Sequence, residues 1–127
     1  TYKTGLSTAI VAGKVNMVVV GAGGGRLPEV LVYDSNLSKI SKRFFVDTKK
    51  LKGELNLAVG DINGDSAPEI IVALNSGINK QIKIYSLSGK LLSQFKAATE
   101  FGAGVVRVGV ADVNFDGIDE IVLMNGE

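Results

Sequence analysis

The chain of 127 residues contains no cysteine and no histidine. Without cysteine it forms no disulfide bond and offers no thiolate to a metal, and without histidine it lacks the commonest general base and zinc ligand. Any bound metal must therefore be a hard cation held by oxygen atoms. The acidic residues that do cluster are explained as metal ligands or turn residues, so we expect a protein that is not an enzyme.

The chain also lacks a long apolar run and an excess of one charge. Its longest apolar runs, such as MVVVGAG at 17–23, are far shorter than the roughly 18 to 20 residues that cross a bilayer, so no membrane insertion is expected. The formal net charge is +1 and the lysines are scattered through turns, so no nucleic acid partner is expected either. The hydrophobic fraction of 46% is enough to build the core of one domain.

The most informative feature of the sequence is an internal repeat. LNLAVGDINGDSAPEIIVAL at 55–74 aligns with VRVGVADVNFDGIDEIVLM at 106–124. VVVGAGGGRLPEVLVYDSNLSKISKRFF at 18–45 aligns in turn with IIVALNSGINKQIKIYSLSGKLLSQFK at 70–96. The chain is thus predicted to be a single segment, 1–127, whose repeats cover about 5–52, 53–103 and 104–127.

Each repeat carries short segments rich in Val, Ile, Leu, Phe and Tyr, separated by clusters of Gly, Asn, Asp and Ser. In the central copy these segments are 55–60, 70–74, 81–86 and 90–96. No window has the 3.6-residue period of a helix, so the chain is predicted to be all-β. Four strands in a repeat of this length are typical of a β-propeller blade, although a β-sandwich with chance similarity between hairpins is an alternative.

The predicted blades do not close a ring. The chain holds two copies and half of a third, about two and a half blades of four antiparallel strands, whereas propellers need at least four blades. Thr1 is not a natural start, and we expect the chain to be a processed or excised piece of a longer protein. Further blades from the parent chain, or partner subunits, would then complete this incomplete propeller.

Two nine-residue segments, DINGDSAPE at 61–69 and DVNFDGIDE at 112–120, are candidate metal sites. Oxygen atoms at positions one, three, five and nine, with the carbonyl at position seven, can converge on one point. The first set is Asp61, Asn63, Asp65, the carbonyl of Ala67 and Glu69, and the second is Asp112, Asn114, Asp116, the carbonyl of Ile118 and Glu120. About six oxygen ligands suit Ca²⁺. The alternative is that Asp and Asn cap polar turns without a metal.

The two segments differ at position six, where a sharp turn needs a positive φ. Gly117 meets that need and Ser66 does not, so the second loop is expected to bind calcium better. An EF-hand is excluded, because position twelve is Val72 or Leu123 and strands, not helices, are predicted on both sides.

The segments VGDINGDSAPEIIVAL and VADVNFDGIDEIVLM resemble the FG-GAP repeats of integrin-α-type β-propellers, also known in bacteria as VCBS repeats. This resemblance implies calcium bound between the first two strands of a blade, by the ten residues named above. Position nine is Glu here, whereas Asp is more usual in the family. The first repeat has lost the loop at 12–21, and no calcium is expected there.

The resemblance further implies a non-enzymatic, calcium-binding segment that serves adhesion or recognition of a protein or glycan ligand. An extracellular or cell-surface location is expected, because millimolar calcium fills even weak oxygen sites there. One alternative is a structural subunit that completes a ring or filament by strand pairing with other chains. A further alternative is a lectin or carbohydrate-processing domain.

Three weaker patterns complete the set. Tyr33 and Tyr85 occupy matching positions, as do Phe44 and Phe95, and we expect these aromatic residues to pack between blades or at strand edges. GAGGGRLPE at 21–29 is expected to be a glycine-rich turn and not a phosphate loop. FGAG at 101–104 is expected to mark the entry to a blade.

Overall fold

The computed structural model describes residues 6–11, 16–76, 79–98, 100, 102 and 104–126, and these contain β-strands and no α-helix. The strands are β1 (Leu6–Val11), β2 (Met17–Ala22), β3 (Glu29–Asp34), β4 (Ile40–Phe45), β5 (Leu55–Gly60), β6 (Glu69–Ser76), β7 (Asn79–Ser86), β8 (Leu91–Lys96), β9 (Val105–Ala111) and β10 (Glu120–Gly126). The strands β5 to β8 coincide closely with the four segments expected in the central repeat.

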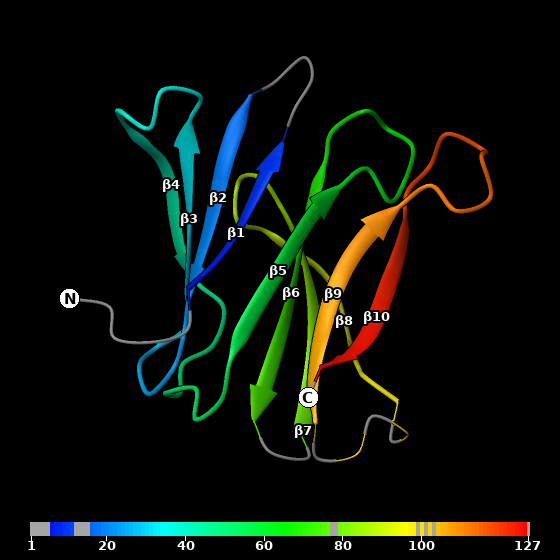
Figure 1. Cartoon of the computed structure of the whole chain (residues 1–127). Helices are drawn as coiled ribbons and strands as arrows, with labels where there is room; N and C mark the ends of the chain where they lie inside the picture. Colours follow the sequence, from blue (N-terminus) through cyan, green and yellow to red (C-terminus); the bar gives the residue numbers. More distant parts are fainter. Residues whose placement is uncertain are drawn as a thin grey trace.

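The strands form three antiparallel sheets, with the orders β1-β2-β3-β4, β5-β6-β7-β8 and β10-β9. Figure 1 shows the sheets standing side by side, with β1, β5 and β9 as the adjacent strands of neighbouring sheets. The expected all-β fold of incomplete, propeller-like blades is thereby confirmed. The division of 1–127 into one domain with three repeats stays a prediction.

The hydrophobic core lies between the sheets, and β6 is its centre. Because side chains alternate across a strand, Ile70, Val72 and Leu74 face the first sheet while Ile71 and Ala73 face β9. All five side chains are buried, which explains why this segment reads as a continuous apolar run. Burial of each large aliphatic side chain contributes about 1.5–3 kcal/mol, so β6 holds both neighbouring sheets against it.

The predicted packing of aromatic residues between blades is confirmed for one pair. Tyr85 of β7 is buried, and its ring lies 5.0 Å from the ring of Phe44 in β4 of the neighbouring sheet. Its hydroxyl donates to the carbonyl of Val46 at 3.3 Å. Tyr33 is half-buried and Phe95 is exposed. They occupy the same repeat positions as Tyr85 and Phe44 but do not share their surroundings. Phe101 and Ala103 of the FGAG segment lie outside the described residues.

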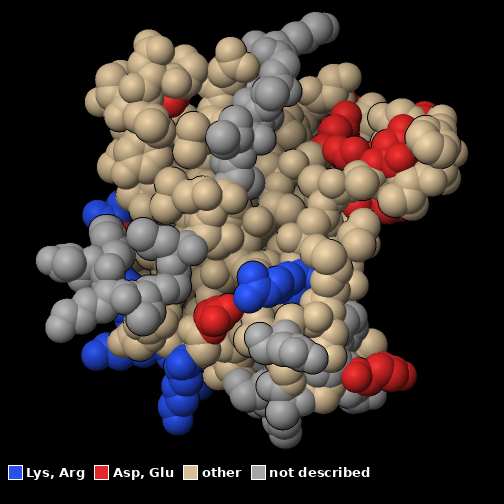
Figure 2. Space-filling view, viewed as in Figure 1, with Lys and Arg blue, Asp and Glu red and all other residues tan. Residues whose placement is uncertain are grey.

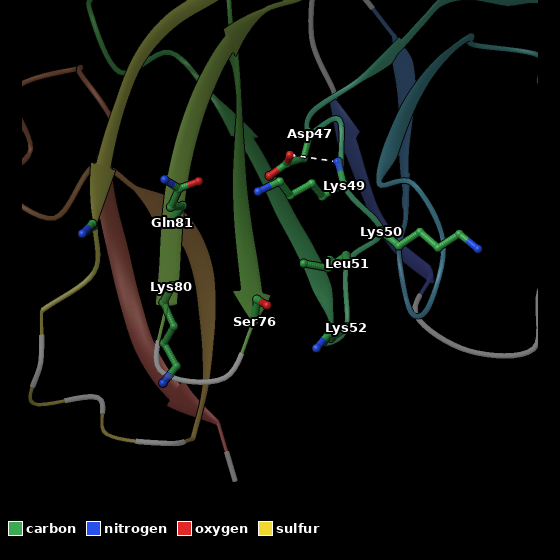
Figure 3. A pocket seen from close by; sticks show the side chains of 9 residues that line it. Asp47, Lys49, Lys50, Leu51, Lys52, Ser76, Lys80 and Gln81 are labelled. Atoms are coloured by element: carbon green, nitrogen blue, oxygen red, sulfur yellow. Dashed lines mark hydrogen bonds between the residues drawn. The ribbon is translucent and has the colours of Figure 1, made fainter.

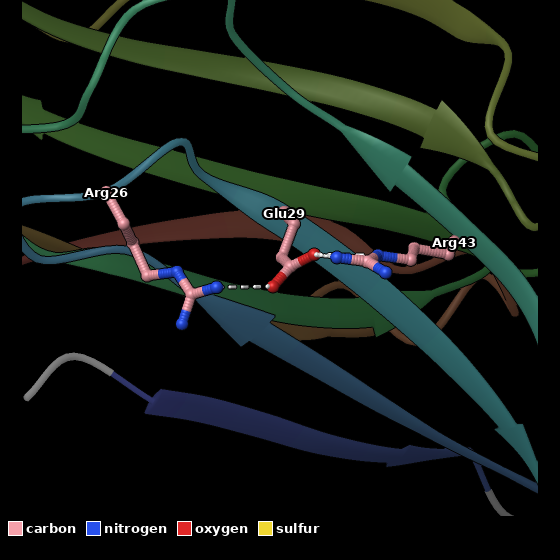
Figure 4. A network of polar contacts seen from close by, with 3 residues as sticks. All are labelled: Arg26, Glu29 and Arg43. Carbon is pink, nitrogen blue, oxygen red and sulfur yellow. Dashed lines mark hydrogen bonds and ion pairs between the residues drawn. The ribbon is translucent and has the colours of Figure 1, made fainter. Parts of the chain in front are cut away.

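The glycine-rich segment is the connection between β2 and β3, as expected. Gly24 and Gly25 have φ values of 70° and 79°, which glycine adopts without strain. The segment ends at Glu29, which is fully buried and paired with two arginines (Figure 4). Arg26 approaches one carboxylate oxygen at 3.1 Å and Arg43 of β4 approaches the other at 2.7 Å. Two arginines thus compensate the buried charge and join the turn to the outer strand.

Side chains, not a backbone ladder, join the adjacent strands of neighbouring sheets. The amide of Leu57 in β5 donates to Ser7 Oγ of β1 at 3.1 Å. The amide of Val108 in β9 donates to Asn56 Oδ1 of β5 at 2.7 Å, which repeats the same arrangement one sheet further on. Asn75 of β6 is buried and bonds both to the amide of Val106, at 2.8 Å, and to its carbonyl, at 3.0 Å.

Replacement of Asn75 by alanine is expected to lower the free energy of unfolding by about 2–3 kcal/mol, because a buried N–H and a buried C=O of Val106 lose their partner. Urea denaturation measures the change. The matched control is Asn36→Ala, which removes an exposed amide and is expected to change stability by less than about 0.5 kcal/mol. Equal effects of the two substitutions would contradict the role given to Asn75.

The buried phenol of Tyr85 is expected to make the stability of the fold sensitive to alkaline pH. Burial, with a smaller contribution from the negative charge of Asp47, raises the pKa of the Tyr85 phenol from 10.0 to about 12. The folded state therefore holds this proton more tightly than the unfolded state, and the resulting stabilisation is complete below pH 10 and lost as the pH rises to about 12. We expect urea midpoints measured from pH 8 to 12 to fall less steeply for Tyr85→Phe than for the wild type. Parallel curves would contradict this assignment.

Candidate metal sites

Both predicted loops lie at the same end of the strands. The first connects β5 to β6 and the second connects β9 to β10, and both extend from the upper right of the molecule in Figure 1. Figure 2 shows acidic side chains gathered over this region. The fold therefore places the two loops on neighbouring sheets, at one edge of the molecule.

In the first loop, the side chains at positions one, three and five bind the amides of the loop itself. The Asp61 carboxylate accepts hydrogen bonds from the amides of Gly64 at 2.7 Å and Ser66 at 2.8 Å. Asn63 Oδ1 accepts from the amide of Asp65 at 2.9 Å, and Asp65 Oδ1 accepts from the amide of Ala67 at 2.8 Å. The backbone is thereby curled around these oxygen atoms.

The second loop repeats this pattern. Asp112 accepts from the amides of Asp116 at 3.1 Å and Gly117 at 2.8 Å. Asn114 Oδ1 accepts from the amide of Asp116 at 2.9 Å, and Asp116 Oδ1 accepts from the amide of Ile118 at 2.9 Å. Three of these bonds are the same in both loops, whereas the second bond to position one comes from the amide at position four in the first loop and at position five in the second.

The glutamate at position nine closes each loop. Glu69 accepts hydrogen bonds from the amide of Ile62 at 3.1 Å and from Asn63 Nδ2 at 2.9 Å. Glu120 accepts from the amide of Val113 at 2.9 Å and from Asn114 Nδ2 at 2.9 Å. The longer side chain of glutamate therefore reaches back to positions two and three of its own loop.

As these side chains stand, no group of three or more carboxylates in the described part of the chain is close enough to hold a metal ion. The glutamate of each loop contacts the amide nitrogen of the asparagine, which is a donor and not a metal ligand. The ligand types fit a hard cation, because a carboxylate oxygen has two acceptor directions and can bind an amide and a cation together. The Asn–Glu contact would have to open for both side chains to offer oxygen atoms.

The electrostatics of the first loop favour a cation. Burial raises the pKa of Glu69, and the negative charges of Asp65 and Asp61 raise it further, against hydrogen bonds from Ile62 and Asn63. Desolvation acts to raise the pKa of Asp61 as well, but hydrogen bonds from the amides of Ser66, Gly64 and Asn63 outweigh it and lower this pKa. The loop thus keeps Asp61 ionised while three carboxylates repel one another.

The two loops also touch each other, through a residue that the sequence interpretation did not single out. Asp119, at position eight of the second loop, accepts from the amide of Asp61 at 3.0 Å and donates its own amide to the Asp61 carbonyl at 2.9 Å. A Cβ at Gly60 would lie 2.5 Å from the Asp119 carboxylate, so glycine is needed for this approach. In the sequence, Asp119 differs from the residue at position eight of the first loop, Pro68, and this difference between the two copies is what could have drawn attention to it.

Position six has a positive φ in both loops, as expected at Gly117 but against the expectation for Ser66. Gly117 has a φ of 89° and Ser66 a φ of 68°. Position four also has a positive φ, 77° at Gly64 and 64° at Phe115, and the sequence interpretation missed this requirement. Phe115 is 91% exposed, so no packing compensates its strained backbone.

Residues 61–123 match the family model described as FG-GAP-like repeat. This segment includes both loops and the strands between them, and the match agrees with the resemblance of the loops to FG-GAP repeats. No curated protein matches the chain. The expected loss of the loop in the first repeat concerns 12–21, of which residues 12–15 lie outside the described part.

The family suggests a β-propeller-like module for adhesion or recognition. Its members are generally non-enzymatic and typically belong to extracellular or cell-surface domains. The part of the chain that the structure describes contains no helix with the length and apolarity to span a membrane.

The two residues at position six provide a reciprocal test of the loop backbone. Ser66→Gly is expected to raise the free energy of unfolding by about 0.5–1 kcal/mol, because glycine removes the strain of a positive φ at a small entropic cost. Gly117→Ser is expected to lower it by a similar amount. Guanidinium denaturation in the presence of chelator measures both changes without any contribution from bound metal, and changes of the same sign would contradict the equivalence of the two positions.

Proposed function

We propose that this chain is a calcium-binding, non-enzymatic β-propeller segment that serves adhesion or recognition at the cell surface or outside the cell. The observation that carries the proposal is the duplication of one loop structure. Two loops on neighbouring sheets carry oxygen-bearing side chains at the same positions, and in both loops these side chains accept hydrogen bonds from the amides at positions five, six and seven.

In this proposal, each loop holds one Ca²⁺ through positions one, three, five, seven and nine. The first set is Asp61, Asn63, Asp65, the carbonyl of Ala67 and Glu69, and the second is Asp112, Asn114, Asp116, the carbonyl of Ile118 and Glu120. The bound ion supplies the positive charge that offsets the repulsion between the loop carboxylates. The amide hydrogen bonds of Asp61 and Asp112 hold each loop in its curled form. Calcium would therefore bind the folded chain in preference to the unfolded chain and stabilise it.

A second candidate function is that of a structural subunit whose free strand edge pairs with another chain. The observation that favours it is the last sheet, in which β10 pairs with β9 and has no other partner among the described residues. An unpaired edge is a template for a further strand. The alternative predicts a ring or filament, which light scattering of the purified chain distinguishes from a monomer.

Calcium binding is tested by calorimetric titration and by thermal unfolding of the metal-free chain. We expect two calcium ions per chain and a melting temperature that rises with calcium, since a ligand at 100 times its Kd stabilises the folded state by about 2.7 kcal/mol. Magnesium at the same concentration is expected to stabilise less, because it is smaller and demands a tighter octahedral shell.

Two matched variants each replace the carboxylates at positions one and five of one loop and leave the other loop intact. Asp112→Asn with Asp116→Asn should leave a single calcium ion bound in the first loop, and Asp61→Asn with Asp65→Asn should leave a single ion in the second. The absence of binding heat together with an unchanged melting temperature of the wild type would overturn the calcium proposal.

A further inference from the structure

A pocket with a volume of about 460 Å³ lies at the end of the strands opposite the two acidic loops. It opens between the connection from β4 to β5 and the adjoining parts of β6, β7 and β8 (Figure 3). We call it the lysine pocket, and its lining residues are Asp47, Lys49, Lys50, Leu51, Lys52, Ser76, Lys80, Gln81 and Lys96. A cavity of this size falls within the usual range of small-molecule sites, about 300–1,000 Å³.

The lysine pocket has a strongly positive lining. Five of its nine residues are lysines and one, Asp47, is acidic. The Asp47 carboxylate is turned onto its own loop, where it accepts hydrogen bonds from the amides of Thr48 at 2.7 Å and Lys49 at 3.1 Å. Among the described residues, ion pairs join only Arg26 and Arg43 to Glu29, so none of these lysines is paired with a carboxylate.

Lys80 adds a buried charge to this lining. The residue is only 4% exposed, and its ammonium group donates to the carbonyl of Gly102. A buried ammonium group is costly unless negative charge compensates it, and the carbonyl supplies only a partial charge. An anion in the pocket would supply the missing compensation, and the surrounding lysines would attract it.

The remaining lining is neutral and suits a ligand with hydroxyl groups. Ser76, at the end of β6, offers a hydroxyl and Gln81, in β7, an amide, and both residues are half-buried. Leu51 is buried and contributes an apolar surface. Figure 3 shows the Lys50 side chain directed away from the other lining side chains, so the remaining lysines would bind the anionic groups. Lysines for anionic groups, hydrogen-bonding groups for hydroxyls and an apolar contact for a ring together match a charged sugar better than a bare inorganic ion.

We propose that the lysine pocket binds an anionic saccharide, an oligosaccharide that carries uronate or sulfate groups. The inference rests on the proposed recognition function and names the chemical class of its ligand. The lysines bind the anionic groups as point charges, so the affinity depends strongly on ionic strength. The sequence conceals this site, because its lysines come from three separate segments that only the fold brings together.

The test is calorimetric titration with four probes: a heparin hexasaccharide, an oligogalacturonate, maltohexaose and polyphosphate. Binding is expected for the sulfated or the uronate probe, with an affinity that falls as salt rises, and none is expected for neutral maltohexaose. Polyphosphate is expected to bind at least about tenfold more weakly than the better saccharide, because it offers no hydroxyl groups to Ser76 and Gln81. Equal or tighter binding of polyphosphate overturns the saccharide assignment.

The variant pair Lys49→Gln with Lys52→Gln tests the pocket itself. Both side chains are exposed, so the fold should be unaffected, and the saccharide Kd is expected to rise about tenfold. The matched control pair, Lys39→Gln with Lys90→Gln, removes two exposed lysines outside the pocket and is expected to change the Kd less than about twofold. Equal loss in both pairs would show a diffuse charge effect and overturn the proposal.

Saccharide titration in the presence of a chelator tests the lysine pocket independently of the calcium proposal. The lysine pocket shares no residue with the two loops, so saccharide binding is expected to persist in EDTA. A chain that binds saccharide but no calcium refutes the calcium proposal alone, and a chain that binds calcium but neither anionic saccharide refutes the lysine pocket alone.

Discussion

The architecture depends on how the adjacent strands of neighbouring sheets satisfy their backbone groups. The strands β1, β5 and β9 lie side by side but belong to different sheets, so their facing amides do not form a ladder. Ser7, Asn56 and Asn75 supply the missing partners with side-chain oxygen atoms. Together with β6, which is buried on both faces, these bonds make each sheet dependent on its neighbour, as in other repeat architectures.

This arrangement sorts the charges of the chain to opposite ends of its strands. The connections from β5 to β6 and from β9 to β10 carry the carboxylates of the two loops, whereas the connection from β4 to β5 carries three of the lysines of the pocket. A formal net charge of +1 therefore hides a polarised surface. A nearly neutral chain can thus carry clustered carboxylates at one end of its strands and clustered lysines at the other.

Features encoded within one segment were predictable from the sequence. The apolar run of β6, the strands on either side of it and the two acidic loops each occupy consecutive residues, and the repeat doubled the signal for each. Features that join distant segments were not predictable. The contact of Asp119 with Asp61, the buried bonds of Asn75 and the gathering of Lys52, Lys80 and Lys96 arise only when sheets pack together. The positive φ of Phe115 was missed for another reason, since aromatic residues rarely adopt it.

The contact between Asp119 and Asp61 gives the repeats a direction. Asp119 of the second loop holds Asp61, at position one of the preceding loop, by two hydrogen bonds. The corresponding residue of the first loop is Pro68, which has neither an amide proton nor a carboxylate to offer. The two copies are therefore not equivalent, because Asp at this position can make both of these hydrogen bonds and Pro can make neither. Shuffling the blades in a designed propeller would have to preserve their order.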